Sequence, residues 1–282
     1  MLIRTRILLT LNKLFRCPVH PFNLQNDGKT SYAMWQYEKG ADTIKNYAEK
    51  VDAETMFSGK DVLDIGCGAA GKSMYYASLG AKSVTGMDVV PYYEEEATAL
   101  AESLGFSDVF RFVLGDAAHM DFPDESFDVI IMNDAMEHVD DPMGVLNEAA
   151  RVLKKGGRLY LNFPPYNHPY GAHLSDCIGF PWVHVFFSDK VLIEAYKALC
   201  ADKPDGEKRI AFRISKKENG EEYFSYINKM TIKRFKKLKA KCPLSVFDYR
   251  EMPLRPVFAP FCKLPILREF LVKMVVVILE KN

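Results

Sequence analysis

The sequence lacks closely paired cysteines, long apolar runs and net charge. Its six cysteines include no C-x-x-C pair, which argues against a zinc finger or a secreted disulfide framework and favours a reducing cytoplasm. The longest apolar run, Met274 to Leu279, falls well short of the roughly 18 residues that a membrane span needs. Because 37 basic side chains balance 37 acidic ones, no overall field attracts nucleic acid. We therefore expect a cytoplasmic protein that is not integral to a membrane and has no nucleic-acid partner.

The first residues also lack the features of a secretion signal. Polar Thr5, Thr10 and Asn12 interrupt the apolar stretch MLIRTRILLTLNKLF, and no small-residue cleavage site follows. Four basic residues accompany its leucines and isoleucines: Arg4, Arg6, Lys13 and Arg16. This mixture is compatible with two interpretations: a basic amphipathic segment in peripheral contact with an anionic membrane, or a helix that packs on the rest of the protein.

Short apolar runs alternate with helical patterns between Lys60 and Phe163. The runs that are typical of strands are DVLDIG, SVTGMDV, FRFVLGDA, FDVIIMND and GRLYLNF. Apolar residues recur at helical spacing in Ser73 to Leu79, Tyr93 to Leu104 and Pro142 to Leu153. This alternation predicts an α/β fold with βαβ units and a parallel sheet. Near the end, TIKRFKKLKAK predicts a basic helix, and LSVFDYR and MVVVILEKN predict two late strands.

A glycine-rich loop follows the first predicted strand. DVLDIGCGAAGKS contains G-x-G-x-x-G at Gly66, Gly68 and Gly71, where glycines let a ligand approach backbone N–H groups at a helix start. Asp88 follows twenty residues after Gly68, at the end of the second predicted strand, where a carboxylate can accept from ribose hydroxyls. Asp64 lies two residues before Gly66, and a carboxylate there suits an ammonium group better than a pyrophosphate. These residues favour S-adenosylmethionine over NAD.

Five ordered blocks resemble the class I S-adenosylmethionine-dependent methyltransferases, in particular the group with the type 11 methyltransferase domain. The blocks are VLDIGCGAAG, GMDVV, GDAAHMDFPDESFDVI, MEHVDDP and NEAARVLKKGGRLYLNFPP, in the expected order between Val62 and Pro165. The resemblance implies a doubly wound, Rossmann-like sheet of seven mostly parallel strands, with the final strand antiparallel.

The resemblance also implies which residues bind the cofactor. They are Asp64, Gly66, Gly68, Gly71, Met87, Asp88, Val89, Asp116, Ala117 and Asn133. The loop after the first strand would line the methionine end. The acid at the end of the second strand would hold the ribose, and its two neighbours would flank the adenine. The GDAAHM residues would meet the adenine edge, and the asparagine at the end of the fourth strand would lie near the methionine moiety.

Two stretches depart from the plainest form of that family. Residues 1–55 precede the first strand and are expected to form a helical cap or lid, with CPVHPFNLQNDGKTSYAMWQYEKG over the donor site. Residues 56–282 are then expected to form the methyltransferase domain. Within it, a segment of about 164–222 shows no regular periodicity, and it is expected to recognise the acceptor because such enzymes place substrate recognition in their elaborations.

The resemblance implies methyl transfer to a small-molecule or lipid-like acceptor by in-line displacement, in which the enzyme aligns the reactants and excludes water. Three histidines are candidates for the base that a neutral acceptor needs: His138 in EHVDDP, and His173 and His184 in NHPYGAHLSDCIGFPWVH. The alternative for each of them is a role in packing or in a turn. No metal is expected, because the fifth strand is not followed by the Asp/Asn pair of Mg²⁺-dependent relatives and the histidines lack zinc-site spacing.

Two other functions stay open at the level of sequence. A binding or regulatory protein would keep Asp64, Asp88 and Asp116 for the donor without catalysing a reaction. An NAD-dependent oxidoreductase would share the glycine loop, but Asp64 and the blocks after the third strand argue against it. S-adenosylmethionine is therefore the cofactor common to the first two interpretations.

Overall fold

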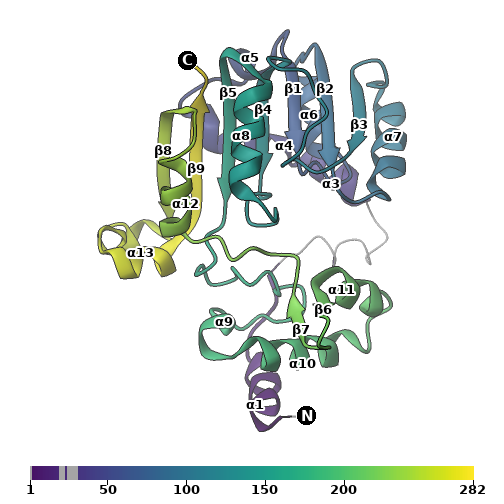
Figure 1. The fold of residues 1–282 in the computed structure, drawn as a ribbon. Helices are drawn as coiled ribbons and strands as arrows, with labels where there is room; N and C mark the ends of the chain where they lie inside the picture. Colours follow the sequence, from purple (N-terminus) through teal and green to yellow (C-terminus); the bar gives the residue numbers. More distant parts are fainter. Residues whose placement is uncertain (1, 19–22, 24–30) are drawn as a thin grey trace. The chain divides into compact units, whose positions relative to one another are not determined.

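The computed structural model describes residues 2–18, 23 and 31–282 (Figure 1). The chain forms two compact units, each built from several stretches of sequence. The sheet unit comprises Gly28–Phe163, Lys233–Met252 and Met274–Asn282. The insertion unit comprises Met1–Asp27, Pro164–Ile232 and Pro253–Lys273. Part of the predicted lid, residues 19–22 and 24–30, lies outside the described residues. The predicted boundary between residues 55 and 56, and the role of the leader as a lid, stay predictions.

Seven strands form one sheet, in the order β3-β2-β1-β4-β5-β9-β8. Their bounds are Asp61–Ile65 (β1), Ser83–Asp88 (β2), Phe110–Leu114 (β3), Phe127–Asn133 (β4), Leu153–Phe163 (β5), Ser245–Pro253 (β8) and Val272–Glu280 (β9). Pairing is parallel from β3 through to β5. The final strand β9 pairs antiparallel with β5, with Arg158 opposite Glu280, and lies between β5 and β8. The predicted sheet is therefore confirmed.

Helices of the sheet unit bury the strands on the two faces of the sheet. They are α3 (Tyr32–Glu38), α4 (Gly40–Ala48), α5 (Ala53–Phe57), α6 (Gly71–Ser78), α7 (Tyr93–Leu104), α8 (Pro142–Val152) and α12 (Ile232–Lys239). The helices predicted to begin near residues 73, 93 and 142 are confirmed as α6, α7 and α8. Strand β4 is buried along nearly its whole length, as a central strand covered on both faces must be.

The helices α3 and α4 pack closely against α6. A side chain at Gly71 would place its Cβ 2.0 Å from the carbonyl oxygen of Ala33. A side chain at Gly40 would collide with the ring of Tyr75, 2.1 Å from the added Cβ. Only glycine, which has no Cβ, allows these close approaches. Gly71 therefore has a packing role as well as its predicted place in the cofactor loop.

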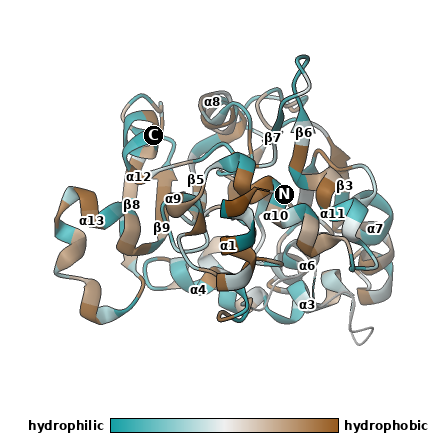
Figure 2. Cartoon of the chain, turned by 90° about the horizontal axis from the view of Figure 1, so that it is seen from below, coloured by the Kyte–Doolittle hydropathy of each residue, from teal (hydrophilic) through white to brown (hydrophobic). Residues whose placement is uncertain are grey.

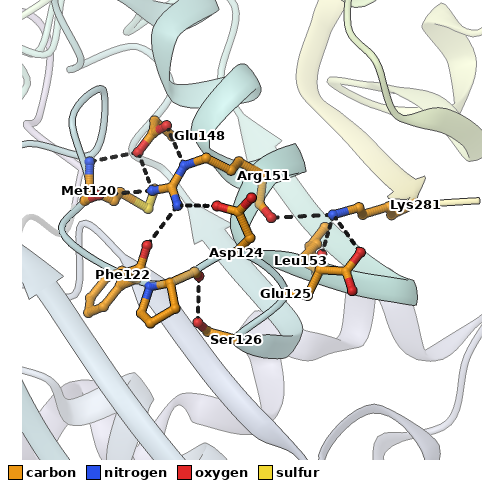
Figure 3. Close-up of polar contacts among 10 residues, drawn as sticks. Met120, Phe122, Asp124, Glu125, Ser126, Glu148, Arg151, Leu153 and Lys281 are labelled. Carbon is orange, nitrogen blue, oxygen red and sulfur yellow. Dashed lines mark hydrogen bonds and ion pairs between the residues drawn. The ribbon is translucent and has the colours of Figure 1, made fainter.

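Arg151 fixes the loop that leads into β4 (Figure 3). Its Nη1 donates to the Phe122 carbonyl at 2.7 Å and to Asp124 Oδ1 at 2.8 Å. Its Nη2 donates to the Met120 carbonyl at 2.9 Å and to Glu148 Oε2 at 2.8 Å. The planar guanidinium presents several donors in a fixed arrangement, so one side chain ties the loop to α8. This loop follows the predicted adenine-binding residues, and the clamp limits its freedom.

Helices dominate the insertion unit. They are α1 (Ile3–Asn12), α9 (Val183–Phe186), α10 (Asp189–Cys200), α11 (Gly206–Arg213) and α13 (Pro265–Leu271). A short antiparallel ribbon joins β6 (Ile214–Lys216) and β7 (Glu222–Phe224). The interpretation of about 164–222 as a stretch without regular periodicity is wrong for α10, α11 and β6. In α10, Val191, Leu192, Ala195 and Tyr196 recur at helical spacing and are buried.

A buried ion-pair network holds the insertion unit together. Asp176 is 1% exposed, and its Oδ2 accepts from Arg209 Nη1 at 3.0 Å and from Tyr196 OH at 2.9 Å. Arg213 Nη2 lies 3.2 Å from the other carboxylate oxygen. An isolated buried charge would be costly, so the two arginines and the aspartate depend on one another.

Helix α1 packs on α10 with one face. Leu8 is fully buried, and Asn12 accepts from the Gly179 N–H at 2.8 Å. The other face leaves Ile3 and Leu14 exposed to 79% and 78%. The packing interpretation of this segment is therefore confirmed, and its contact with a membrane stays a prediction. Among the described residues no helix has the length and hydrophobicity that crossing a bilayer requires.

Candidate cofactor site

The loop after β1 has a conformation that favours glycine. Gly66 and Gly68 have φ angles of 73° and 54°, in the left-handed region. A Cβ on Gly66 would also lie 2.7 Å from the Cβ of Ala135. Around Gly68 there is space, since the nearest atom to an added Cβ is in the ring of Tyr93, 3.9 Å away. The loop is therefore open at Gly68, as close approach of a ligand requires.

Asp88 is oriented by the backbone at the end of β2. Its Oδ2 accepts from the Gly68 N–H at 2.8 Å, and its Oδ1 accepts from the Val90 N–H at 3.0 Å. Burial raises the pKa of Asp88, and these backbone hydrogen bonds oppose the shift. A carboxylate has about four lone-pair positions, so both oxygens retain capacity to accept from a ligand's hydroxyl groups.

Asp64 is a buried carboxylate beneath the same loop. It is 3% exposed, and its Oδ2 accepts from Ser73 Oγ at 2.6 Å. Burial raises the pKa of Asp64 to about 6, although the Ser73 hydroxyl and the distant charge of Lys72 act in the opposite direction. Lys72 itself pairs with Asp134, 3.4 Å from its Nζ. A cationic ligand near Asp64 would supply the charge compensation that burial makes valuable.

The predicted adenine-binding residues meet at the ends of β2 and β3. Met87 and Ala117 are buried, whereas Val89 is 65% exposed. Asp116 is exposed, and its Oδ1 accepts from the Ala118 N–H at 2.9 Å, which shapes the turn. The β2–β3 pairing brings this turn next to Asp88, because the Gly115 N–H donates to the Asp88 carbonyl at 3.0 Å. The structure thus brings the predicted ribose and adenine residues together.

Asn133 belongs to a buried hydrogen-bond network at the ends of β4 and β5. Its Oδ1 accepts from Tyr47 OH and from Asn162 Nδ2, both at 2.6 Å, and its Nδ2 donates to Tyr76 OH at 3.0 Å. Asn162 Nδ2 also donates to Tyr47 OH at 2.9 Å. The side chain of Asn133 is thus engaged with protein groups. Its predicted contact with the methionine moiety stays a prediction.

One tyrosine of the stretch expected over the donor site, Tyr32, lies near Asp134 and Asp88. Burial, followed by the charges of Asp134 and Asp88, raises the pKa of Tyr32. Its hydroxyl accepts from Gln36 Nε2 at 2.7 Å, and Gln36 Oε1 is shielded from solvent with no partner among the described residues. No sequence motif marks Tyr32, because it comes from α3, far from the loop in the chain.

The three candidate histidines belong to different units. In the sheet unit, His138 follows β4, with its Nε2 3.9 Å from Glu137 Oε1. Burial and the nearby Asp134 carboxylate raise the pKa of Glu137 well above its usual range. A buried acid of this kind is favoured in its neutral form, in which it can donate a hydrogen bond.

In the insertion unit, His173 has a φ of 52° and its carbonyl accepts from Arg213 Nε at 3.1 Å. The ring of His184 lies 4.7 Å from that of Tyr166, centroid to centroid. Both ring nitrogens of His184 are shielded, and burial lowers its pKa to about 4 although the Tyr166 backbone opposes the shift. His184 is therefore a neutral imidazole at neutral pH, whereas the roles of all three histidines in proton transfer stay predictions.

Comparison with known proteins finds similarity over part of the chain. Residues 63–161 match the model of a family described as "Methyltransferase domain". The chain is 40% identical over 99 residues to "Sterol 24-C-methyltransferase ERG6B" of Gibberella zeae, which covers 35% of this chain and 26% of that protein. It is 36% identical over 102 residues to "Probable tocopherol O-methyltransferase, chloroplastic" of Oryza sativa subsp. japonica, covering 36% and 28% of the two chains. The match spans only about a quarter of the length of these relatives.

Solved structures share the fold over a longer stretch. The [4+2]-cyclase SpnF superimposes with a TM-score of 0.56 at 17% identity, covering 92% of this chain and 86% of that one. At this identity the likeness concerns the fold alone. The family model and the shared fold therefore cover the same strands, β1 to β5.

Proposed function

We propose that the class I methyltransferase domain recognised at residues 63–161 binds S-adenosylmethionine, and that the protein transfers its methyl group to a small, lipid-like acceptor. The single observation that carries the proposal is Asp64, a buried carboxylate at the end of β1, directly before a glycine loop that is open at Gly68. S-adenosylmethionine carries an ammonium and a sulfonium, so it brings positive charge to a place where the protein has buried negative charge. The two phosphates of NAD would bring charge of the wrong sign.

Each part of the donor has a group of fitting chemistry. Asp88 is held by two backbone N–H groups in a position to accept from the two ribose hydroxyls. Asp116, on the neighbouring turn, is exposed and would accept from the exocyclic amine of adenine. Gln36 Oε1, buried without a partner among the described residues, offers a further acceptor for the ammonium group. Unsatisfied buried oxygens are costly, which favours a ligand that donates to them.

Methyl transfer from a sulfonium is an in-line displacement. The methyl carbon forms a bond to the acceptor as its bond to sulfur breaks, and the electron pair of that bond stays on sulfur. The protein's contribution is alignment and exclusion of water. A hydroxyl acceptor must also lose its proton, for which His138, His173 and His184 are the candidates. The names of the relatives, a sterol and a tocopherol methyltransferase, support an apolar acceptor.

A donor-binding titration followed by a transfer assay tests the proposal. Calorimetric titration of the full chain with S-adenosylmethionine is expected to show one site, and Asp88→Ala is expected to weaken it at least about tenfold through lost hydrogen bonds to the ribose. The matched control is Asp121→Ala, which removes an exposed carboxylate at the start of the loop before β4. Radiolabelled methyl transfer to sterols and chromanols is then screened. No binding of the donor would disprove the proposal.

A second candidate function is a donor-binding protein that does not transfer the methyl group. SpnF has the same fold and is named as a [4+2]-cyclase, so the fold by itself does not establish methyl transfer. A donor-binding protein would bind the donor tightly but leave every acceptor unmethylated, and the donor would change its stability or its binding to a partner.

Single replacements of the three histidines by alanine distinguish base catalysis from packing, because a base acts on turnover at saturating acceptor.

A further inference from the structure

Residues 254–271, called the apolar loop below, connect β8 to β9. None of the side chains in this loop is buried. The loop consists of two 3-10 turns, Pro256–Phe258 and Phe261–Lys263, and of α13. Five of its nine large apolar side chains are exposed: Val257 by 66%, Phe261 by 49%, Leu264 by 55%, Ile266 by 77% and Leu267 by 38%. Figure 2 shows α13 as mainly hydrophobic. An apolar set of this density on a surface marks an interaction site.

The loop has a defined shape. The Leu254 N–H donates to the Leu271 carbonyl at 2.8 Å, which closes its base. Arg268 Nε donates to the Cys262 carbonyl at 2.9 Å, which ties α13 to the second turn. Prolines at positions 256, 260 and 265 further restrict the backbone. The apolar side chains are thus presented by an organised element, so little order has to be gained on binding.

We propose that the apolar loop contacts the surface of a membrane that contains anionic lipid. Arg255 and Lys263 are exposed between its apolar residues, where they would meet lipid phosphates. The one acidic residue, Glu269, accepts from the Ile232 N–H at 3.0 Å, at the base of the loop. Basic residues beside exposed apolar ones, with the acid engaged at the base, give the charge pattern that an anionic surface attracts.

The composition of the loop favours a membrane over a second protein chain. Residues 254–271 contain no serine, threonine, asparagine, glutamine or aspartate, so the loop has few side chains for the polar rim of a protein interface. A standard interface also takes about 20–30 residues from each partner. Eighteen residues, of which five large apolar ones are exposed, fall short of that, whereas a bilayer needs only an apolar tip flanked by cations. This proposal does not depend on methyl transfer.

Co-sedimentation of the full chain with lipid vesicles tests it. One set is phosphatidylcholine, and the other contains about one quarter phosphatidylglycerol. We expect binding to the mixed vesicles, at least about tenfold weaker binding to the neutral ones, and a loss of about tenfold in Arg255→Gln/Lys263→Gln. Phe261→Asp/Ile266→Asp is expected to lose binding by at least about 30-fold, because charged groups then replace two apolar side chains that would enter the bilayer. Thermal melting verifies that each variant is folded.

The matched control is Ile3→Asp/Ile7→Asp, which adds the same charges to exposed positions of the basic helix α1. It is expected to retain binding within about threefold. Loss of binding in this variant equal to or larger than that of the loop variant would overturn the assignment, as would failure of the unaltered chain to bind the mixed vesicles. Sedimentation velocity without lipid addresses a second copy: a dimer that the loop variant dissociates would also overturn the proposal.

Discussion

The two units of this protein differ in how the charge of a buried carboxylate is compensated. In the sheet unit, Asp64 is buried beside a hydroxyl and has no cation directly paired with it among the described residues. In the insertion unit, Asp176 is buried equally well but is paired with two arginines. The first arrangement leaves a group that gains from a cationic ligand, whereas in the second the charge of the carboxylate is compensated by cations of the protein. A buried carboxylate without a paired cation therefore indicates a binding site, whereas one paired with arginines indicates a structural network.

The largest effect is expected from Asp176→Ala, which leaves Arg209 and Arg213 buried without their anion. Removing one partner of a buried pair costs about 3–5 kcal/mol of the free energy of unfolding. The two tryptophans allow each unit to be followed separately, because Trp35 lies in the sheet unit and Trp182 in the insertion unit. In a Trp35→Phe background, urea unfolding reported by Trp182 is expected to shift to lower denaturant.

In a Trp182→Phe background, the transition reported by Trp35 is expected to stay where it was. The control Asp202→Ala, at an exposed position, should change stability by less than about 0.5 kcal/mol. If both tryptophan signals shift together in Asp176→Ala, the units unfold as one and the contrast between them fails.

Acid is expected to act next most strongly for each pH unit, and on the insertion unit. Burial lowers the pKa of His168 and of His184 to about 4, from about 6.5 in the unfolded chain. Between those values the unfolded state binds more protons, so these groups lower the stability as the pH falls from 6.5 towards 4, by about 1 kcal/mol per pH unit for each histidine. Urea unfolding followed through Trp182 measures this slope, and His184→Phe should roughly halve it. An unchanged slope in that variant would show that other groups are responsible.

Donor binding to the sheet unit should have its own pH dependence. Asp64 has a pKa of about 6, and only its ionised form attracts the donor's positive charge. Affinity is therefore expected to be constant above pH 7 and to fall by up to about tenfold per pH unit below 6, about 1.4 kcal/mol. Asp64→Asn should bind more weakly at neutral pH and lose most of this dependence. Asp121→Asn, an exposed change, should keep both, and a pH-independent affinity in the unaltered chain would remove Asp64 from the site.

The same comparison explains what could be predicted from the sequence. In the sheet unit each strand, helix and polar strand end comes from a continuous window, so local periodicity predicted β1 to β5, α6 to α8 and the positions of Asp64 and Asp88. Tyr47 was not predicted, because it reaches the sheet's carboxyl edge from α4 and no local pattern encodes that packing. Tyr32, from α3, lies in the stretch that was expected over the donor site, but no motif marked it within that stretch.

The insertion unit could not be predicted in this way, because three distant stretches build it. Asn12 bonds to the backbone of Gly179, and Arg209 bonds to Asp176, across loops that no window spans. Cys177 and Cys200 illustrate the same point, since their sulfur atoms lie 3.6 Å apart although the sequence shows no paired cysteines. Periodicity in α10 was present over as many residues as in α7, but it was missed because the stretches around it are irregular.

The smallest effect on stability is expected from Ile266→Asp in the apolar loop, and its smallness is informative. Ile266 is 77% exposed, so the folded protein gains little from its side chain and the free energy of unfolding should change by less than about 0.5 kcal/mol. Leu192→Asp, in the buried face of α10 of the same unit, should by contrast abolish the Trp182 transition. A large loss of stability in Ile266→Asp would mean that the loop packs against protein. A negligible one would mean that folding does not require the loop to be so hydrophobic, and binding to another surface is then what its apolar side chains serve. The loop carries nine large ones: Leu254, Val257, Phe258, Phe261, Leu264, Ile266, Leu267, Phe270 and Leu271.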